Sequence, residues 1–141
     1  MTHNLRYARW LAAIAVLVSA YVHFHLWNDG MKDLDVVGPA FLINAIGGVV
    51  IAVLLVTWSH WIPAFLTLGF GVSTLGAFII STLPSGFFDV HERWVGGYVW
   101  AAAISEAAAI VLGALLLLAD NPLKSRHELQ DGSSVGRAHL H

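Results

Sequence analysis

The chain has 141 residues, of which 57% are hydrophobic and only 11% are charged, and it contains no cysteine. This composition is far more apolar than that of an ordinary soluble domain, so we expect a membrane protein. The formal net charge of −2 provides no basic surface for nucleic acid, and the lack of cysteine excludes disulfides and thiolate metal sites.

Four apolar segments are each long enough to cross a bilayer. About 20 helical residues, at 1.5 Å each, match a hydrocarbon core roughly 30 Å thick. The expected spans cover about residues 10–27, 39–58, 62–83 and 98–119. We therefore predict an all-α fold: a four-transmembrane-helix bundle, antiparallel and up-down, forming a single domain over residues 1–119.

The first segment begins with Arg6 and Arg9, followed by an apolar run from Trp10 to about Trp27. This charged start resembles a signal peptide. The apolar run is, however, longer than the hydrophobic region of such a peptide, and it ends in YVHFHLW rather than in a small-residue cleavage site. We interpret it as a retained transmembrane helix with a tryptophan at each membrane interface.

The second and third segments are separated only by Ser59, His60 and Trp61. This short connection predicts a tight antiparallel hairpin, with Ser59 as the N-cap of the third helix. Both segments carry small residues at four-residue spacing, a pattern typical of faces where membrane helices pack closely. The small residues are Ala40, Asn44, Gly48 and Ala52 in the second segment, and Gly69, Ser73, Ala77 and Ser81 in the third.

The fourth segment carries one carboxylate, Glu106, near the middle of an apolar run. An acidic residue at the centre of a span costs about 2.5 to 3.5 kcal/mol, so Glu106 should face protein or water rather than lipid. No Lys or Arg lies in any expected span, and we predict a protonated carboxyl because desolvation disfavours the charged form. The expected hydrogen-bond partner is Asn44 or Ser73, with His23 as the alternative if its ring points inward.

Basic residues predict the orientation of the bundle. The two terminal segments carry five of the seven Lys and Arg residues, and the two long connectors carry one each. The terminal five are Arg6, Arg9, Lys124, Arg126 and Arg137. Because positive charge favours the cytoplasmic side, we expect both termini in the cytoplasm and the protein in the cytoplasmic membrane of a bacterium.

The tail over residues 120–141 is polar, and we expect it to be disordered. Its GSSVGRA stretch resembles the product of an open reading frame that runs into a transfer RNA gene. If this resemblance holds, His139 and His141 carry no selected function, so we do not use them as metal ligands.

Four side chains near the outer ends of the segments are candidate ligands for a metal or a haem. They are His23, His25, His91 and Glu92. Two residues apart on a helix corresponds to about 200° of rotation, so His23 and His25 cannot bind one ion without local unwinding. A haem, copper or zinc site would therefore combine one of them with His91. We predict no cofactor, with haem or copper/zinc as the alternative.

The sequence contains no recognisable nucleophile–base pair, phosphate-binding loop or zinc-protease motif, which favours a protein that is not an enzyme. The span region resembles small four-helix membrane proteins of unknown function from high-GC bacteria, through FLINAIGG, ISEAAAIVLGALLLL and a histidine at the end of the first helix. That resemblance implies no particular activity.

We therefore predict a small accessory or interaction subunit of a larger membrane complex. Its partners would be membrane lipid and other membrane-protein subunits or further copies of the chain. One alternative is an outward-facing metal- or haem-binding bundle for electron transfer or metal handling. Another is a small transporter or proton-coupled protein that uses Glu106.

Overall fold

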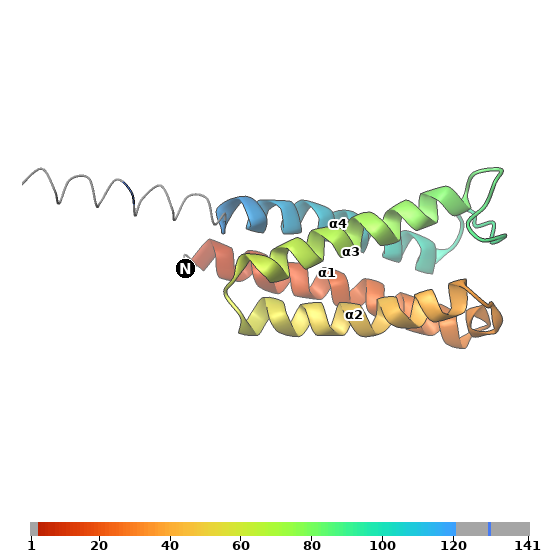
Figure 1. The fold of residues 1–141 in the computed structure, drawn as a ribbon, viewed down its shortest axis with the longest axis horizontal. Helices are drawn as coiled ribbons and strands as arrows, with labels where there is room; N and C mark the ends of the chain where they lie inside the picture. Colours follow the sequence, from red (N-terminus) through yellow and green to blue (C-terminus); the bar gives the residue numbers. More distant parts are fainter. Residues whose placement is uncertain (1–2, 121–129, 131–141) are drawn as a thin grey trace, which may run out of the picture.

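The computed structural model describes residues 3–120 and residue 130. It contains four long helices and one short 3-10 helix between the first two (Figure 1). The long helices are α1 (His3–Asn28), α2 (Val37–Thr57), α3 (Trp61–Ser81) and α4 (Gly97–Ala119), and the 3-10 helix η1 is Met31–Asp33. Each long helix has the length and hydropathy to cross a membrane, so the prediction of four apolar helices is confirmed.

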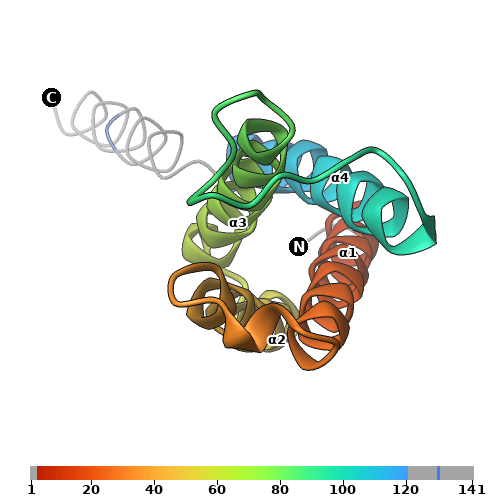
Figure 2. The same ribbon diagram turned by 90° about the vertical axis from the view of Figure 1, so that its right-hand side faces the viewer.

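The four helices run alternately in opposite directions and form a ring in the order α1, α2, α3, α4 (Figure 2). α1 packs extensively against α2 and against α4, and α3 packs extensively against α4. α2 and α3 contact each other far less, and they diverge from their short connection toward the opposite end of the bundle (Figure 1). The expected antiparallel α2–α3 hairpin with its short connection is therefore present, but its two helices do not pack closely along their length.

Two glycines explain why α2 and α3 separate. A Cβ atom at Gly48 of α2 would lie 2.7 Å from the Cβ of Ala20 on α1. A Cβ atom at Gly71 of α3 would lie 2.8 Å from the carbonyl oxygen of Glu106 on α4. Because small residues let membrane helices approach closely, α2 is held against α1 and α3 against α4.

α1 begins before the apolar run, so it includes Arg9, which the expected span of residues 10–27 leaves out. Arg9 lies inside α1, and its side chain is only 3% exposed. The guanidinium donates hydrogen bonds to the carbonyl oxygens of Leu55 (3.3 Å), Trp58 (3.1 Å) and His60 (2.8 Å). It also forms an ion pair with Asp120 at 2.5 Å. Arg9 thus connects α1 to the α2–α3 connection and to the end of α4.

The N-cap of α3 is His60 and not Ser59. The backbone N–H of Ile62 donates to the Nδ1 of His60 at 3.3 Å. The His60 ring also stacks on the ring of Trp58, with centroids 4.8 Å apart. The imidazole nitrogen of His60 therefore accepts a hydrogen bond from a free N–H of the first turn, whereas the sequence predicted the hydroxyl of Ser59 as the acceptor.

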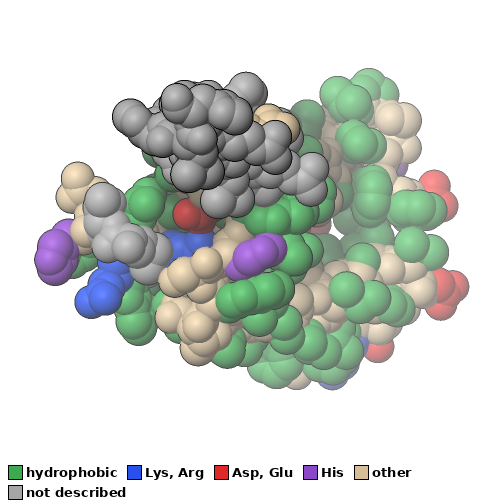
Figure 3. Space-filling view, turned by 60° about the vertical axis from the view of Figure 1, so that its left-hand side comes forward, with side chains coloured by type: hydrophobic (Ala, Val, Ile, Leu, Met, Phe, Trp, Pro, Cys, Tyr) green, Lys and Arg blue, Asp and Glu red, His purple; other side chains and the backbone are tan. Residues whose placement is uncertain are grey.

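The exterior of the bundle is apolar. Where grey residues do not cover the surface, Figure 3 shows many hydrophobic side chains between the two ends of the bundle, with charged side chains mostly toward those ends. Large hydrophobic residues on the helices are more than half exposed, including Ile43 (70%), Ile104 (66%) and Leu118 (67%). Such a surface suits lipid and not water. The chain is therefore a small multi-pass integral membrane protein.

The predicted disordered tail falls almost entirely outside the described residues. Only Asp120 and Gln130 of the range 120–141 are described. The three basic residues of the tail and its terminal histidines also lie outside, so the expectations about them remain predictions.

Candidate functional site

A cavity of about 590 Å³ lies within the bundle, and all four helices contribute to its wall. Most of its lining is apolar, with a few polar side chains from different helices. The polar lining residues include His23, Asn44, Ser73, Thr74, Glu92 and Glu106. The structure thus gathers around one cavity several residues that the sequence selected as candidates.

Small side chains on α2 and α3 create this cavity. The small-residue face of α3 was expected to pack against another helix, but Gly69, Ser73, Ala77 and Ser81 all line the cavity. A Cβ atom at Gly69, or at Gly47 of α2, would have no neighbouring atom within 4 Å. Because the two helices diverge, these small faces border open space and not each other.

The cavity opens between α2 and α3. Ile43 of α2 and Phe65 of α3 both line it, yet these residues are 70% and 54% exposed. A residue that lines a cavity and is also largely exposed lies at its mouth. Since the flank of the bundle is apolar, this mouth opens on an apolar surface that suits lipid.

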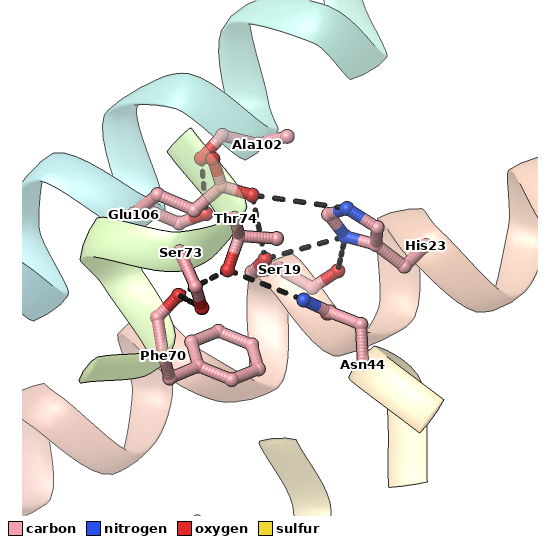
Figure 4. A network of polar contacts seen from close by, with 9 residues as sticks. Ser19, His23, Asn44, Phe70, Ser73, Thr74, Ala102 and Glu106 are labelled. Atoms are coloured by element: carbon pink, nitrogen blue, oxygen red, sulfur yellow. Dashed lines mark hydrogen bonds and ion pairs between the residues drawn. The ribbon is translucent and has the colours of Figure 1, made fainter. Parts of the chain in front are cut away.

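Three polar side chains meet where α1 faces α4 (Figure 4), and two of them, His23 and Glu106, line the cavity. The Oγ of Ser19 donates a hydrogen bond to the Oε1 of Glu106 at 3.0 Å. The Nε2 of His23 lies 3.9 Å from the same carboxylate oxygen. The Glu106 side chain is 2% exposed and that of His23 is 12% exposed. We call this group the Ser19–His23–Glu106 cluster, and the prediction that Glu106 faces the protein interior is confirmed.

The backbone of α1 fixes the ring of His23. Its Nδ1 lies 2.8 Å from the carbonyl oxygen of Ser19, one helical turn earlier. A carbonyl oxygen can only accept, so Nδ1 carries a proton and donates it. This bond directs Nε2 toward Glu106 and the cavity (Figure 4). His23, the alternative partner in the sequence-based prediction, therefore does point inward.

Asn44 and Ser73 do not bond to Glu106, which corrects the preferred prediction for its partner. The Nδ2 of Asn44 donates to the Oγ1 of Thr74 at 3.2 Å, and the Oγ of Ser73 donates to the carbonyl oxygen of Phe70 at 3.2 Å. The Oδ1 of Asn44 is buried and has no hydrogen-bond partner within the described part of the chain.

The physical reason for these bonds is the packing of the helices. α4 lies directly against α1, so a side chain of α1 reaches the carboxyl group. α2 and α3 line other parts of the same cavity, and their polar side chains bond to each other or to their own backbone. Sequence spacing shows which residues share a face of one helix, but not which helix that face meets.

His23 and His25 point to different sides of α1, as helix geometry predicts. His23 lines the cavity, whereas the ring of His25 stacks on Tyr98 with centroids 4.5 Å apart. The Nε2 of His25 also lies 3.1 Å from a carboxylate oxygen of Asp29, whose side chain is 57% exposed. His25 therefore belongs to the surface near the α1–α2 and α3–α4 connectors.

The remaining metal candidates lie in the connector between α3 and α4. The Nε2 of His91 lies 3.2 Å from the carbonyl oxygen of Pro84, and Glu92 lines the cavity while its backbone N–H bonds to the carbonyl of Ser81 at 3.1 Å. Over residues 3–120, no three His, Cys, Asp or Glu side chains are grouped as a metal site requires.

Ser19 is the member of the cluster that was missing from the predicted site. It lies four residues before His23, on the same face of α1, and this spacing was the available signal. A serine in a membrane helix often bonds to its own backbone, so its hydroxyl alone did not indicate a contact with another helix.

Comparison with known proteins adds no relative from which a role could be transferred. No family model, no curated protein and no solved structure matches the chain.

Proposed function

We propose that the chain is a small multi-pass protein of the bacterial cytoplasmic membrane that binds a lipid-soluble molecule inside its bundle. One observation carries the proposal: an apolar cavity of about 590 Å³ whose wall includes His23 and Glu106 of the buried Ser19–His23–Glu106 cluster. Sites for small molecules are typically cavities of about 300 to 1,000 Å³, mostly apolar, with a few convergent polar groups. The polar end of an amphiphile would meet the cluster, and its apolar part would extend toward the mouth between α2 and α3.

The position of Glu106 supports a binding role over a purely structural one. Ionisable residues inside the membrane are costly, and they commonly mark binding or transport sites. A carboxyl group has several acceptor positions, and among the described side chains the hydrogen bond to Glu106 comes from Ser19. The carboxyl group therefore retains capacity for a bound molecule that enters the cavity.

The proposed orientation has the start of α1 and the end of α4 on the cytoplasmic side. These two ends lie together at one end of the bundle (Figure 1), where Arg9 pairs with Asp120. Most of the basic residues of the sequence belong to the segments at this end, which supports a cytoplasmic location. Phe87 and Val90 of the connector at the opposite end line the cavity, and so does Phe65 near the start of α3, so the cavity extends from that connector toward the cytoplasmic half of the bundle.

An accessory or interaction subunit is a second candidate function, and the small residues of α3 favour it. A Cβ atom at Gly69 or Gly76 would have no atom within 4 Å. Small residues on an open helix face permit close approach by a helix of another subunit or of a second copy. In this case a protein helix, and not a small molecule, would cover the mouth between α2 and α3.

Native mass spectrometry of the protein, extracted from its own membrane in mild detergent, tests the proposal. We expect a wild-type complex with one lipid-soluble molecule per chain. Gly69→Leu fills the cavity, so it should lose the bound mass. Gly76→Leu is the matched control, because Gly76 lies on the same helix, has equal space for a side chain and does not line the cavity.

Two outcomes would contradict the binding function. A wild-type chain with no bound molecule, or one whose bound mass is equally retained by both leucine variants, would exclude the cavity as the binding site. A co-purifying polypeptide that Gly69→Leu displaces would instead support the interaction subunit.

A further inference from the structure

We propose that the molecule bound in the cavity is a lipid-soluble phenol, whose hydroxyl oxygen bridges the Nε2 of His23 and the carboxyl group of Glu106. This inference rests on the binding function proposed above and specifies the chemical class of the ligand. It follows from three features of the site: a gap between two polar atoms, their hydrogen-bonding capacity, and the aromatic residues around them.

The gap has the size of one bridging oxygen atom. The Nε2 of His23 and the Oε1 of Glu106 are 3.9 Å apart, too far for a direct hydrogen bond. An oxygen about 2.8 Å from each atom would make two good hydrogen bonds, with an angle of about 90° at that oxygen. This angle is about 20° smaller than the tetrahedral angle between the donor and acceptor directions of a hydroxyl, a deviation within the range that hydrogen bonds tolerate.

The two side chains together require a group that both donates and accepts. If the carboxyl group holds the shared proton, it donates and the Nε2 of His23 accepts. If His23 holds that proton, the donor and acceptor exchange places, since Nδ1 already donates to the carbonyl of Ser19. In both states a single hydroxyl satisfies the pair, whereas an ether or an ester oxygen only accepts.

Aromatic side chains lie beside His23 and along the cavity wall. The ring of Phe41 lies against His23, with centroids 4.8 Å apart, and Phe70 also lines the cavity. Aromatic rings pack favourably edge to face or offset against another ring, beyond the effect of buried area. A hydroxyl attached to an aromatic ring therefore fits beside His23 better than an aliphatic alcohol.

The mouth between α2 and α3 accounts for the rest of the ligand. Ile43 and Phe65 at the mouth are apolar and largely exposed to the hydrocarbon region. An alkyl or isoprenoid chain on the ring would leave the cavity there and remain in lipid. The full ligand class is thus a phenol or hydroquinone that carries an apolar chain.

Three probes of equal chain length separate the parts of this inference: 4-octylphenol, 4-octylanisole and 4-octylcyclohexanol. Their dissociation constants would be measured by native mass spectrometry on the full-length chain in detergent. A lost buried hydrogen bond corresponds to about tenfold in affinity, so we expect the phenol to bind about ten times more tightly than the anisole. The phenol should also bind more tightly than the cyclohexanol.

A pair of variants tests the role of His23. His23→Phe removes the acceptor and keeps an aromatic ring, so the preference for phenol over anisole should disappear. His25→Phe is the control because His25 lies on the same helix but does not line the cavity. It should keep the preference.

Each opposite result identifies the step that fails. Equal binding of phenol and anisole to the wild type would overturn the hydroxyl bridge while leaving a binding cavity in place. Equal binding of phenol and cyclohexanol would overturn the aromatic assignment, and a preference that survives His23→Phe would overturn the role of that residue. If the wild type binds none of the three probes, the inference about a phenol fails. The proposed binding function fails only if the protein extracted from its own membrane also carries no bound molecule.

Discussion

Replacement of Arg9 by Gln should strongly destabilise the bundle, although Arg9 does not line the cavity. The guanidinium makes three hydrogen bonds to carbonyl oxygens and an ion pair with Asp120. Removing one partner of a buried ion pair costs about 3 to 5 kcal/mol, because the other charge loses its compensation. The side chain of Asp120 is 21% exposed and retains some hydration. We therefore expect a loss near the lower end of this range, about 3 kcal/mol.

The measurement is the free energy of unfolding in mixed micelles, with the anionic detergent fraction increased and helix content followed by circular dichroism. Arg6→Gln is the matched control, since Arg6 lies one turn earlier on α1 and is exposed. It should change stability by less than about 0.5 kcal/mol. Asp120→Asn should cost less than Arg9→Gln, because the guanidinium keeps its carbonyl partners. If the Arg9 and Arg6 variants are equally stable, the reasoning about this buried charge is refuted.

Three further predictions concern helix packing, Glu106 and orientation. Gly71→Ala should lower the free energy of unfolding by about 1 to 3 kcal/mol, because its Cβ would lie 2.8 Å from the carbonyl oxygen of Glu106. Gly76→Ala is the control, since its Cβ would have no atom within 4 Å. It should leave the free energy of unfolding unchanged or raise it by up to about 1 kcal/mol. Equal effects of the two alanines would contradict close α3–α4 packing. Glu106→Gln should fold with near wild-type stability because it can still accept from Ser19, but Glu106→Leu should lose about 1 to 3 kcal/mol by leaving that hydroxyl unpaired. A leucine variant as stable as the wild type would show that the bond contributes nothing. Finally, green fluorescent protein fused after His141 should fluoresce in the cytoplasm, and an active alkaline phosphatase fusion at the same place would reverse the proposed orientation.

The number of long helices and the approximate bounds of α2, α3 and α4 were predictable from the sequence, because crossing a bilayer imposes a local requirement on about 20 consecutive residues. The interior position of Glu106 was predictable for a similar reason, since the cost of a carboxylate in lipid does not depend on the rest of the fold. Neither prediction requires knowledge of which helices are neighbours.

The burial of Arg9 could not be predicted in this way. Hydropathy assigns a basic residue to the flank of an apolar run, so the expected first span began at Trp10, directly after Arg9. The carbonyl oxygens that compensate its charge belong to Leu55, Trp58 and His60, distant in sequence. Only the packing of α1 beside the α2–α3 connection brings these acceptors within reach.

The partner of Glu106 and the cavity itself were also decided by the tertiary structure. The small residues that include Gly69 and Ser73 form a regular stripe, and this pattern suits either a packed helix or an open wall. Close contacts at Gly48 and Gly71 draw α2 to α1 and α3 to α4. The stripe therefore borders a cavity, and the carboxyl group of Glu106 meets Ser19 of α1. The sequence could not decide either point, because periodicity defines a face of one helix and only the packing of the helices determines what that face contacts.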